Sequence, residues 1–125
     1  MRATKNELPV LLEAGLSTVR GVDWGEMRVG VVSVPAGTDF APLPDDRCQG
    51  PHWGYVLKGR LRVEYAFSEE TVSAGDFIYL PPGHSAVAEE DTEFLEVTPV
   101  HLHQQFVDNA LRNIQIMRAR AATTG

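Results

Sequence analysis

Residues 75–84, Gly-Asp-Phe-Ile-Tyr-Leu-Pro-Pro-Gly-His (GDFIYLPPGH), combine a turn, a short apolar run and a rigid stop. Ala74-Gly75-Asp76 is a turn signal, because glycine adopts backbone conformations that other residues avoid. The run Phe77–Leu80 is typical of a strand, and Pro81-Pro82-Gly83 ends it because proline cannot donate a ladder hydrogen bond. Thr71 and Val72 precede the turn, so we expect them to pair with this strand.

Two further segments show the same alternation of strands and turns. Tyr55–Val63 (YVLKGRLRV) predicts a hairpin that turns at Gly59, and Ala86–Ala88 with Phe94–Val97 predicts another around the acidic turn 89–93, which we interpret as a solvated loop. Met27–Val34 alternates with a period of two, which predicts a strand with one better buried face. Short strands at this spacing indicate an all-β sandwich or barrel.

The C-terminal segment has a different periodicity. Apolar residues recur at intervals of three and four, which predicts one amphipathic helix over about residues 104–120, packed on the outside of the barrel. The 125 residues suit a single domain, with a barrel core over about residues 24–100.

Composition narrows the class of protein. The net charge of −6 and the absence of a basic cluster disfavour nucleic acid as a ligand. No apolar run approaches the roughly 20 residues that span a bilayer, and the N-terminus lacks a signal-peptide core, so we expect a cytoplasmic protein. The single cysteine, Cys48, is then a free thiol, a metal ligand or an intermolecular link.

Three side chains are candidate metal ligands. Cys48 and His52 are four residues apart, so in an extended strand both point to the same face, and His84 follows the rigid proline turn. Thiolate and imidazole suit divalent transition metals, and three protein ligands leave positions open for water or substrate. Each residue also has a structural interpretation, namely a buried thiol, a histidine bonded to a carbonyl and a histidine at the rim.

The spacing around these residues resembles the cupin superfamily. Its first motif has two histidines one residue apart, a glutamate after three or four residues and a glycine six residues later. Counting back from Gly59 places His52 at the glutamate, Cys48 at the second histidine and Asp46 at the first. The ligand spacing is therefore kept while the ligand types differ, and Asp46 joins the candidate metal ligands.

The second cupin motif is matched in its turn and not in its ligand. Gly75, Pro81 and Gly83 stand in place, whereas Ala86 occupies the histidine position and Glu90 the asparagine position. His84 lies two residues before Ala86, on the same side of an extended strand, so we hypothesise that it substitutes for the missing ligand. The resemblance, over roughly residues 35–97, implies an all-β, cupin-type antiparallel β-barrel (jelly-roll-like) with one C-terminal α-helix.

The same resemblance implies a small-molecule pocket inside the barrel with a divalent transition metal, zinc, iron, manganese or nickel, at its floor. The first hypothesis is a metal-dependent enzyme of unresolved reaction, with Glu64 or Glu96 as an acid or base. The alternatives are a non-catalytic sensing module that uses the thiol and a metal-free structural barrel. Trp53 is interpreted as packing on the opposite face.

Two further expectations concern residues outside the motifs. His101 and His103 are interpreted as an exposed strand end, because they fall outside both motifs. Val29–Val34 is an edge-strand candidate with few charges to block pairing, which favours a homodimer through barrel edges.

Overall fold

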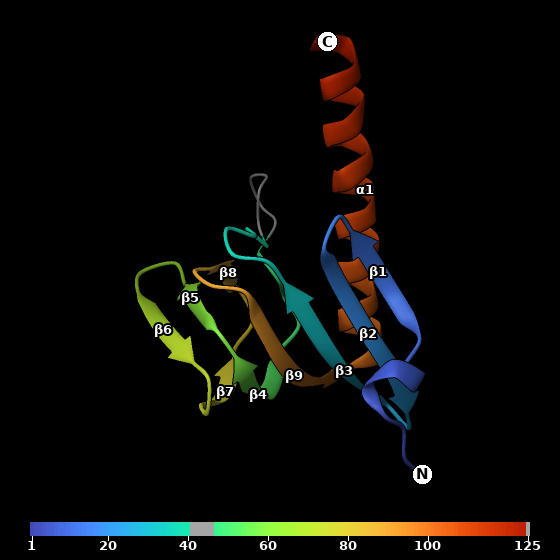
Figure 1. The fold of residues 1–125 in the computed structure, drawn as a ribbon, viewed down its shortest axis with the longest axis vertical. Helices are drawn as coiled ribbons and strands as arrows, with labels where there is room; N and C mark the ends of the chain where they lie inside the picture. The colour runs from blue at the N-terminus through green and yellow to red at the C-terminus, as the bar shows by residue number, and fades with distance from the viewer. Residues whose placement is uncertain (41–46, 125) are drawn as a thin grey trace.

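The computed structural model describes residues 1–40 and 47–124 and contains nine strands, one short 3-10 helix and one long helix (Figure 1). In chain order these elements are η1 Lys5–Glu7, β1 Val10–Ala14, β2 Ser17–Trp24, β3 Met27–Val34, β4 His52–Lys58, β5 Arg60–Glu64, β6 Glu69–Ser73, β7 Phe77–Leu80, β8 Ser85–Ala88, β9 Thr92–Pro99 and α1 Val100–Thr124.

The strands form two antiparallel sheets. Sheet A has six strands in the order β1-β2-β3-β9-β4-β7, and sheet B has three in the order β6-β5-β8. Apolar side chains from both sheets meet between them, among them Val32, Val56, Leu61, Val63 and Phe94. The prediction of an all-β antiparallel fold with one C-terminal helix is confirmed.

The strand pairing differs from the three hairpins expected from the sequence. β4 pairs with β7 and β9, whereas β5 pairs with β6 and β8, so the tight turn at Gly59 joins two sheets. Gly59 has φ 86°, and a Cβ there would lie 2.3 Å from the carbonyl oxygen of Asp91. The turns between β6 and β7 and between β8 and β9 also cross from one sheet to the other. Turn residues indicate that the chain reverses, but they do not specify which strand becomes the partner.

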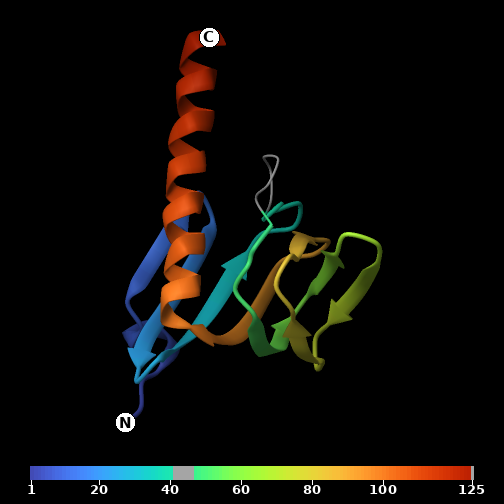
Figure 2. The ribbon, with the colours of Figure 1, turned by 180° about the vertical axis from the view of Figure 1, so that it is seen from behind.

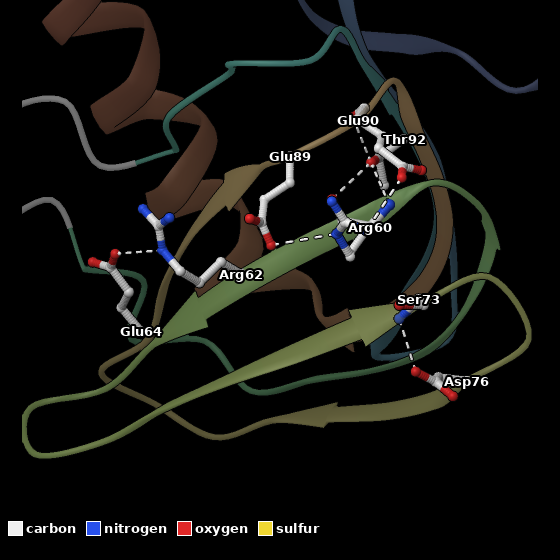
Figure 3. Close-up of polar contacts among 8 residues, drawn as sticks. All are labelled: Arg60, Arg62, Glu64, Ser73, Asp76, Glu89, Glu90 and Thr92. Atoms are coloured by element: carbon white, nitrogen blue, oxygen red, sulfur yellow. Dashed lines mark hydrogen bonds and ion pairs between the residues drawn. The ribbon is translucent and has the colours of Figure 1, made fainter.

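The acidic turn between β8 and β9 is exposed at residues 89–91, as expected of a solvated loop, and it also contacts sheet B (Figure 3). Glu89 and Glu90 lie 3.5 and 3.4 Å from the Arg60 guanidinium. The Thr92 hydroxyl accepts the backbone N–H of Arg60 at 3.1 Å and donates to the Glu90 carbonyl at 2.8 Å. These contacts hold the corner that returns the chain to β9.

The N-terminal third of the chain is more regular than expected. The first strand begins at Val10. β1, β2 and β3 then form two successive antiparallel hairpins in sheet A. β3 lies between β2 and β9, so the prediction that Val29–Val34 is an exposed edge is wrong. Val32 and Val34 enter the core, whereas Met27 and Val29 point to the outer face.

Helix α1 extends past both ends of the predicted range. It begins directly after β9, and its first turns pack on sheet A through His103 and Val107. Figures 1 and 2 show the rest of the helix rising beyond the strands, and residues 118–122 are exposed. Within the described residues, no helix is both long enough and apolar enough to cross a membrane.

Candidate metal centre

Cys48, His52 and His84 come together at the floor of the barrel. His52 opens β4, and Cys48 pairs with His84 across an isolated bridge in which the Cys48 N–H donates to the His84 carbonyl at 2.8 Å. One donor atom from each side chain lies within 4.8 Å of the other two. All three side chains are buried and line a cavity of about 50 Å³.

The ring of His84 is fixed by the proline turn. Its Nδ1 lies 2.7 Å from the carbonyl oxygen of Pro81, so Nδ1 carries the proton and donates it. The lone pair of the imidazole is then on Nε2. The turn that the sequence predicts as a rigid stop therefore also sets which nitrogen of His84 is available to a ligand.

His52 is held between a thiol and a carboxylate. Its Nε2 lies 3.2 Å from Cys48 Sγ, and its Nδ1 lies 3.1 Å from Glu96 Oε2. Glu96 comes from the neighbouring strand β9 and is buried. A carboxylate behind the outer nitrogen of an imidazole orients the ring and makes the inner nitrogen a better ligand.

These contacts shift the pKa values of the buried groups. Burial raises the pKa of the Cys48 thiol, but hydrogen bonds with His52 and His84 outweigh it and lower the pKa to about 6. Burial lowers the pKa of His52, whereas contacts with Cys48 and Glu96 raise it to about 10. Both shifts favour the charged forms of the pair, a thiolate beside an imidazolium.

Glu96 belongs to a charge chain that the sequence did not reveal, which runs through the buried His103 and Arg28 to the exposed Asp23. Its Oε1 lies 2.9 Å from His103 Nε2, and Arg28 Nη1 donates to His103 Nδ1 at 3.0 Å. Arg28 in turn donates to both carboxylate oxygens of Asp23, at 2.7 and 3.1 Å. Burial raises the pKa of Glu96, but contacts with His103 and His52 outweigh it, so Glu96 stays ionised.

The interpretation of His101 and His103 as an exposed strand end is wrong. Both lie in the first turn of α1, where His101 is exposed and His103 is 1% exposed. One feature of the sequence could have indicated a buried partner for His103. Glu96 stands at an inward position of β9, between Phe94 and Thr98. No pattern in the sequence pairs it with a histidine on a helix.

The remaining candidates are placed as follows. Asp46 lies outside the described residues, and Ala86 lines the cavity without a donor atom. Glu64 is on sheet B beside Arg62, 3.2 Å away, and does not line the cavity (Figure 3). Trp53 points outward from β4, as expected, and stacks on Tyr79 with ring centroids 5.3 Å apart.

A larger cavity of about 430 Å³ lies between α1 and the inner side of β1–β3. We call it the vestibule. It shares Val19, Phe40, Cys48 and Phe106 with the small cavity, so the two meet beside the thiol. Its walls are mainly apolar, with polar groups supplied by Arg47, Gln49, Gln105, Asn109 and others.

Residues 30–98 match the profile of the cupin domain family, which is more than half of the chain, and the chain therefore belongs to that family. None of the curated proteins matches it in a sequence comparison. The resemblance stated from the two motifs is thus confirmed.

Solved structures share the fold at low identity. KdgF from Halomonas sp. is 21% identical with a TM-score of 0.59, over 77% of this chain and 91% of that one. The polyketide cyclase RemF from Streptomyces resistomycificus is 21% identical with a TM-score of 0.61, over 79% of this chain and 78% of that one. Oxalate decarboxylase from Bacillus subtilis, described with Mn(II) centres, is 22% identical with a TM-score of 0.62, over 78% of this chain and 28% of that one.

Proposed function

We propose that this cupin is a metal-dependent enzyme that acts on a small, mainly apolar organic molecule. The observation that carries the proposal is the convergence of Cys48, His52 and His84 at the floor of a cavity. Two of the similar folds belong to enzymes, a polyketide cyclase and an oxalate decarboxylase with Mn(II) centres, which supports a catalytic use of this barrel.

The donor set fits a divalent transition metal. The lone pair of His84 Nε2 is left available by the bond from Nδ1 to Pro81, and His52 is backed by a carboxylate. One thiolate and two imidazoles favour zinc or iron(II) over manganese, which prefers oxygen ligands. A bound metal would supply Lewis-acid polarisation of a substrate oxygen, and three protein ligands leave positions open for it.

The vestibule indicates the kind of substrate. A volume of about 430 Å³ falls in the range of pockets that hold drug-sized molecules. Phe40 and Phe106 line both cavities, so an apolar body would pass between them and place its reacting end beside Cys48. Arg47, Gln49 and Asn109 offer polar contacts to the end that stays in the vestibule.

Glu96 and His103 would act as positioning residues. Glu96 holds His52 in one ring orientation, and His103 holds Glu96 from the side of α1. This arrangement fixes the ligand before substrate arrives, which reduces the reorganisation needed in the reaction. A thiol at a ligand position suits a reducing compartment, so the proposal includes a cytoplasmic location.

Metal content of the purified wild type, Cys48→Ser, His52→Ala and His84→Ala tests the proposal. We expect near-stoichiometric zinc or iron in the wild type and a loss of at least about tenfold in affinity for each variant. His101→Ala is the matched control, because His101 is exposed and outside the cluster. A folded wild type that holds no metal and takes up none of zinc, iron(II), manganese or nickel would contradict the proposal.

A second candidate function is a metal-free thiol sensor, favoured by the 3.2 Å contact between Cys48 Sγ and His52 Nε2. The lowered pKa of Cys48 favours the thiolate, which is the reactive form of cysteine. A metal-free wild type whose Cys48 is alkylated much faster than free cysteine at pH 6 would support this function over the enzyme.

A further inference from the structure

Most of the vestibule is built by elements that flank the segment matching the cupin family. That match covers residues 30–98, whereas the vestibule is lined by β1 and β2, from Leu12 to Val19, and by α1, from Leu102 to Met117. Figures 1 and 2 show α1 beside these two strands from opposite sides. Because function depends on sites rather than on the fold itself, these walls are where specificity for a substrate arises.

Two aromatic rings flank the passage from the vestibule to the small cavity, since Phe40 and Phe106 line both. The Phe40 N–H donates to the Ala86 carbonyl at 2.9 Å, and its ring lies edge-on to Phe94 with centroids 6.4 Å apart. Phe106 is carried by α1, and its ring centroid lies 5.9 Å from that of the buried His103. Packed structure holds both sides, so the width of the passage depends on the size of these side chains.

The two cavities differ greatly in size. The small cavity measures about 50 Å³ and the vestibule about 430 Å³. A single water needs about 10–15 Å³ of cavity volume, so the small cavity takes an end group of about three to five non-hydrogen atoms. A molecule that occupies both cavities must therefore present a slender end to Cys48 and keep its body beside α1.

Polar side chains along α1 give the vestibule a hydrogen-bonding side. Gln105, Asn109 and Asn113 are four residues apart, a spacing that places them on one side of the helix, and all three line the vestibule. Amides donate and accept hydrogen bonds without carrying a charge. Among the described residues that line the vestibule, the charged ones are Asp39 and Arg47, which have opposite signs. Arg47 already donates to two backbone carbonyls, at 3.1 and 3.2 Å. The vestibule therefore favours an uncharged molecule with hydroxyl or carbonyl groups along one side.

We propose that Phe106 is a specificity-determining residue that controls which molecules reach the metal centre. It admits the slender end of an elongated, uncharged molecule whose body binds in the vestibule along α1. Branched or aromatic ends are excluded, because they would have to displace the ring of Phe106 or of Phe40 from its packed position. This inference rests on the proposed function, since it takes the cluster at Cys48 as the place where the substrate reacts.

The single cysteine, Cys48, reports on the passage because it lies where the two cavities meet. Its alkylation in the purified protein is followed by mass spectrometry with iodoacetamide, a slender reagent, and with N-(1-pyrenyl)maleimide, a bulky one, each rate relative to that of free cysteine. We expect the ratio of the bulky to the slender rate to rise at least about tenfold in Phe106→Ala. Phe106→Tyr keeps the ring and should keep the wild-type ratio. Metal occupancy cancels, because both reagents act on the same preparation.

The ratio separates control of the passage from a role in packing. Loosening of α1 would speed both reagents alike and leave the ratio unchanged. Phe106→Leu keeps apolar packing, verified by circular dichroism, and removes the ring, so its ratio should also rise.

Two neighbouring positions of α1 test the route through the vestibule. Ala110 lines it, whereas Leu111 is 43% exposed and does not. Ala110→Trp should slow both reagents, and Leu111→Trp, the matched control, should keep the wild-type rates.

A folded Phe106→Leu or Phe106→Ala protein with the wild-type ratio would overturn the proposal, and so would equal rates in Ala110→Trp and Leu111→Trp. Metal content is measured separately. A protein that holds no metal but shows the expected ratios would contradict the proposed function alone, and a metal-loaded protein with unchanged ratios would contradict this inference alone.

Discussion

Sheets A and B use their two faces in opposite ways. On β5 of sheet B, Leu61 and Val63 point into the core, and Arg60, Arg62 and Glu64 point outward (Figure 3). In the middle of sheet A the order is reversed. Arg28, His52, Glu96 and Thr98 are buried, while Trp53, Leu95 and Val97 face outward on neighbouring strands.

The reversal has a physical consequence. Burying a charged group costs free energy unless it is paired, and exposing apolar rings forgoes the gain of burial. Sheet B neither buries charged groups nor exposes apolar rings on β5, so its role is to close the core. Sheet A has both costs, and the metal centre proposed for its inner face would account for the buried charges there. The two sheets therefore differ in how they distribute polar and apolar side chains although they are parts of one fold.

The largest effect is expected in the ordinary core of sheet B. Leu61 is fully buried, so Leu61→Ala should lower the free energy of unfolding by about 2–5 kcal/mol through lost apolar contacts and a cavity. Chemical denaturation measures this change. Leu16→Ala, at a residue that is 82% exposed, is the control and should stay within about 0.5 kcal/mol. Equal losses in both variants would contradict the assignment of the core.

A smaller effect is expected for Glu96→Gln on the inner face of sheet A. The variant keeps the shape but removes a charge that contacts His52 and His103, so the metal-free protein should lose about 1–3 kcal/mol at pH 7. The pKa of Glu96 is lowered in the folded protein, so its contribution is present above the unfolded value of about 4.3 and declines as the pH falls.

The pH dependence provides the check on Glu96. Denaturation of wild type and Glu96→Gln at pH 7 and at pH 4 or below should show a difference that shrinks in acid. Glu64→Gln is the matched control, because Glu64 lies on the outer face of sheet B in a partly exposed pair with Arg62. A Glu96→Gln protein as stable as the wild type at pH 7 would contradict the buried charge chain.

The smallest effect is expected for Arg62→Ala on the outer face of sheet B. Its contact with Glu64 is solvated, and such pairs contribute little, so stability should change by about 0.5 kcal/mol or less. Light scattering should show the same oligomeric state as the wild type. A clearly larger loss of stability would contradict a solvated outer face of sheet B and remove the contrast between the two sheets.

The sequence predicted the candidate site better than it predicted the strand pairing. The motif spacing indicated Cys48, His52 and His84 as candidate ligands, and in the structure their donor atoms lie close together. It also predicted the outward direction of Trp53. The turns at Gly59 and Gly75 were recognised as turns, but the expected hairpins were wrong because each turn joins two sheets.

Strand β3 shows a limit of periodicity. Both alternating sets, Met27–Val29–Val31 and Val32–Val34, contain apolar residues, so a period of two could not decide which set enters the core. The pairing with β9 decides it, because Val32 lies opposite the core residue Phe94. Met27 and Val29, in the other set, point to the outer face of sheet A.

The sequence by itself determined the family, the positions of the turns and the spacing of three ligand candidates, because these depend on residues close together in the chain. The tertiary structure decided the rest. Glu96 on β9, His103 on α1 and Arg28 on β3 meet only after the sheets form, since contacts between distant segments depend on which strands pair. The chemistry of the site thus combines local motifs with a charge chain that only the fold assembles.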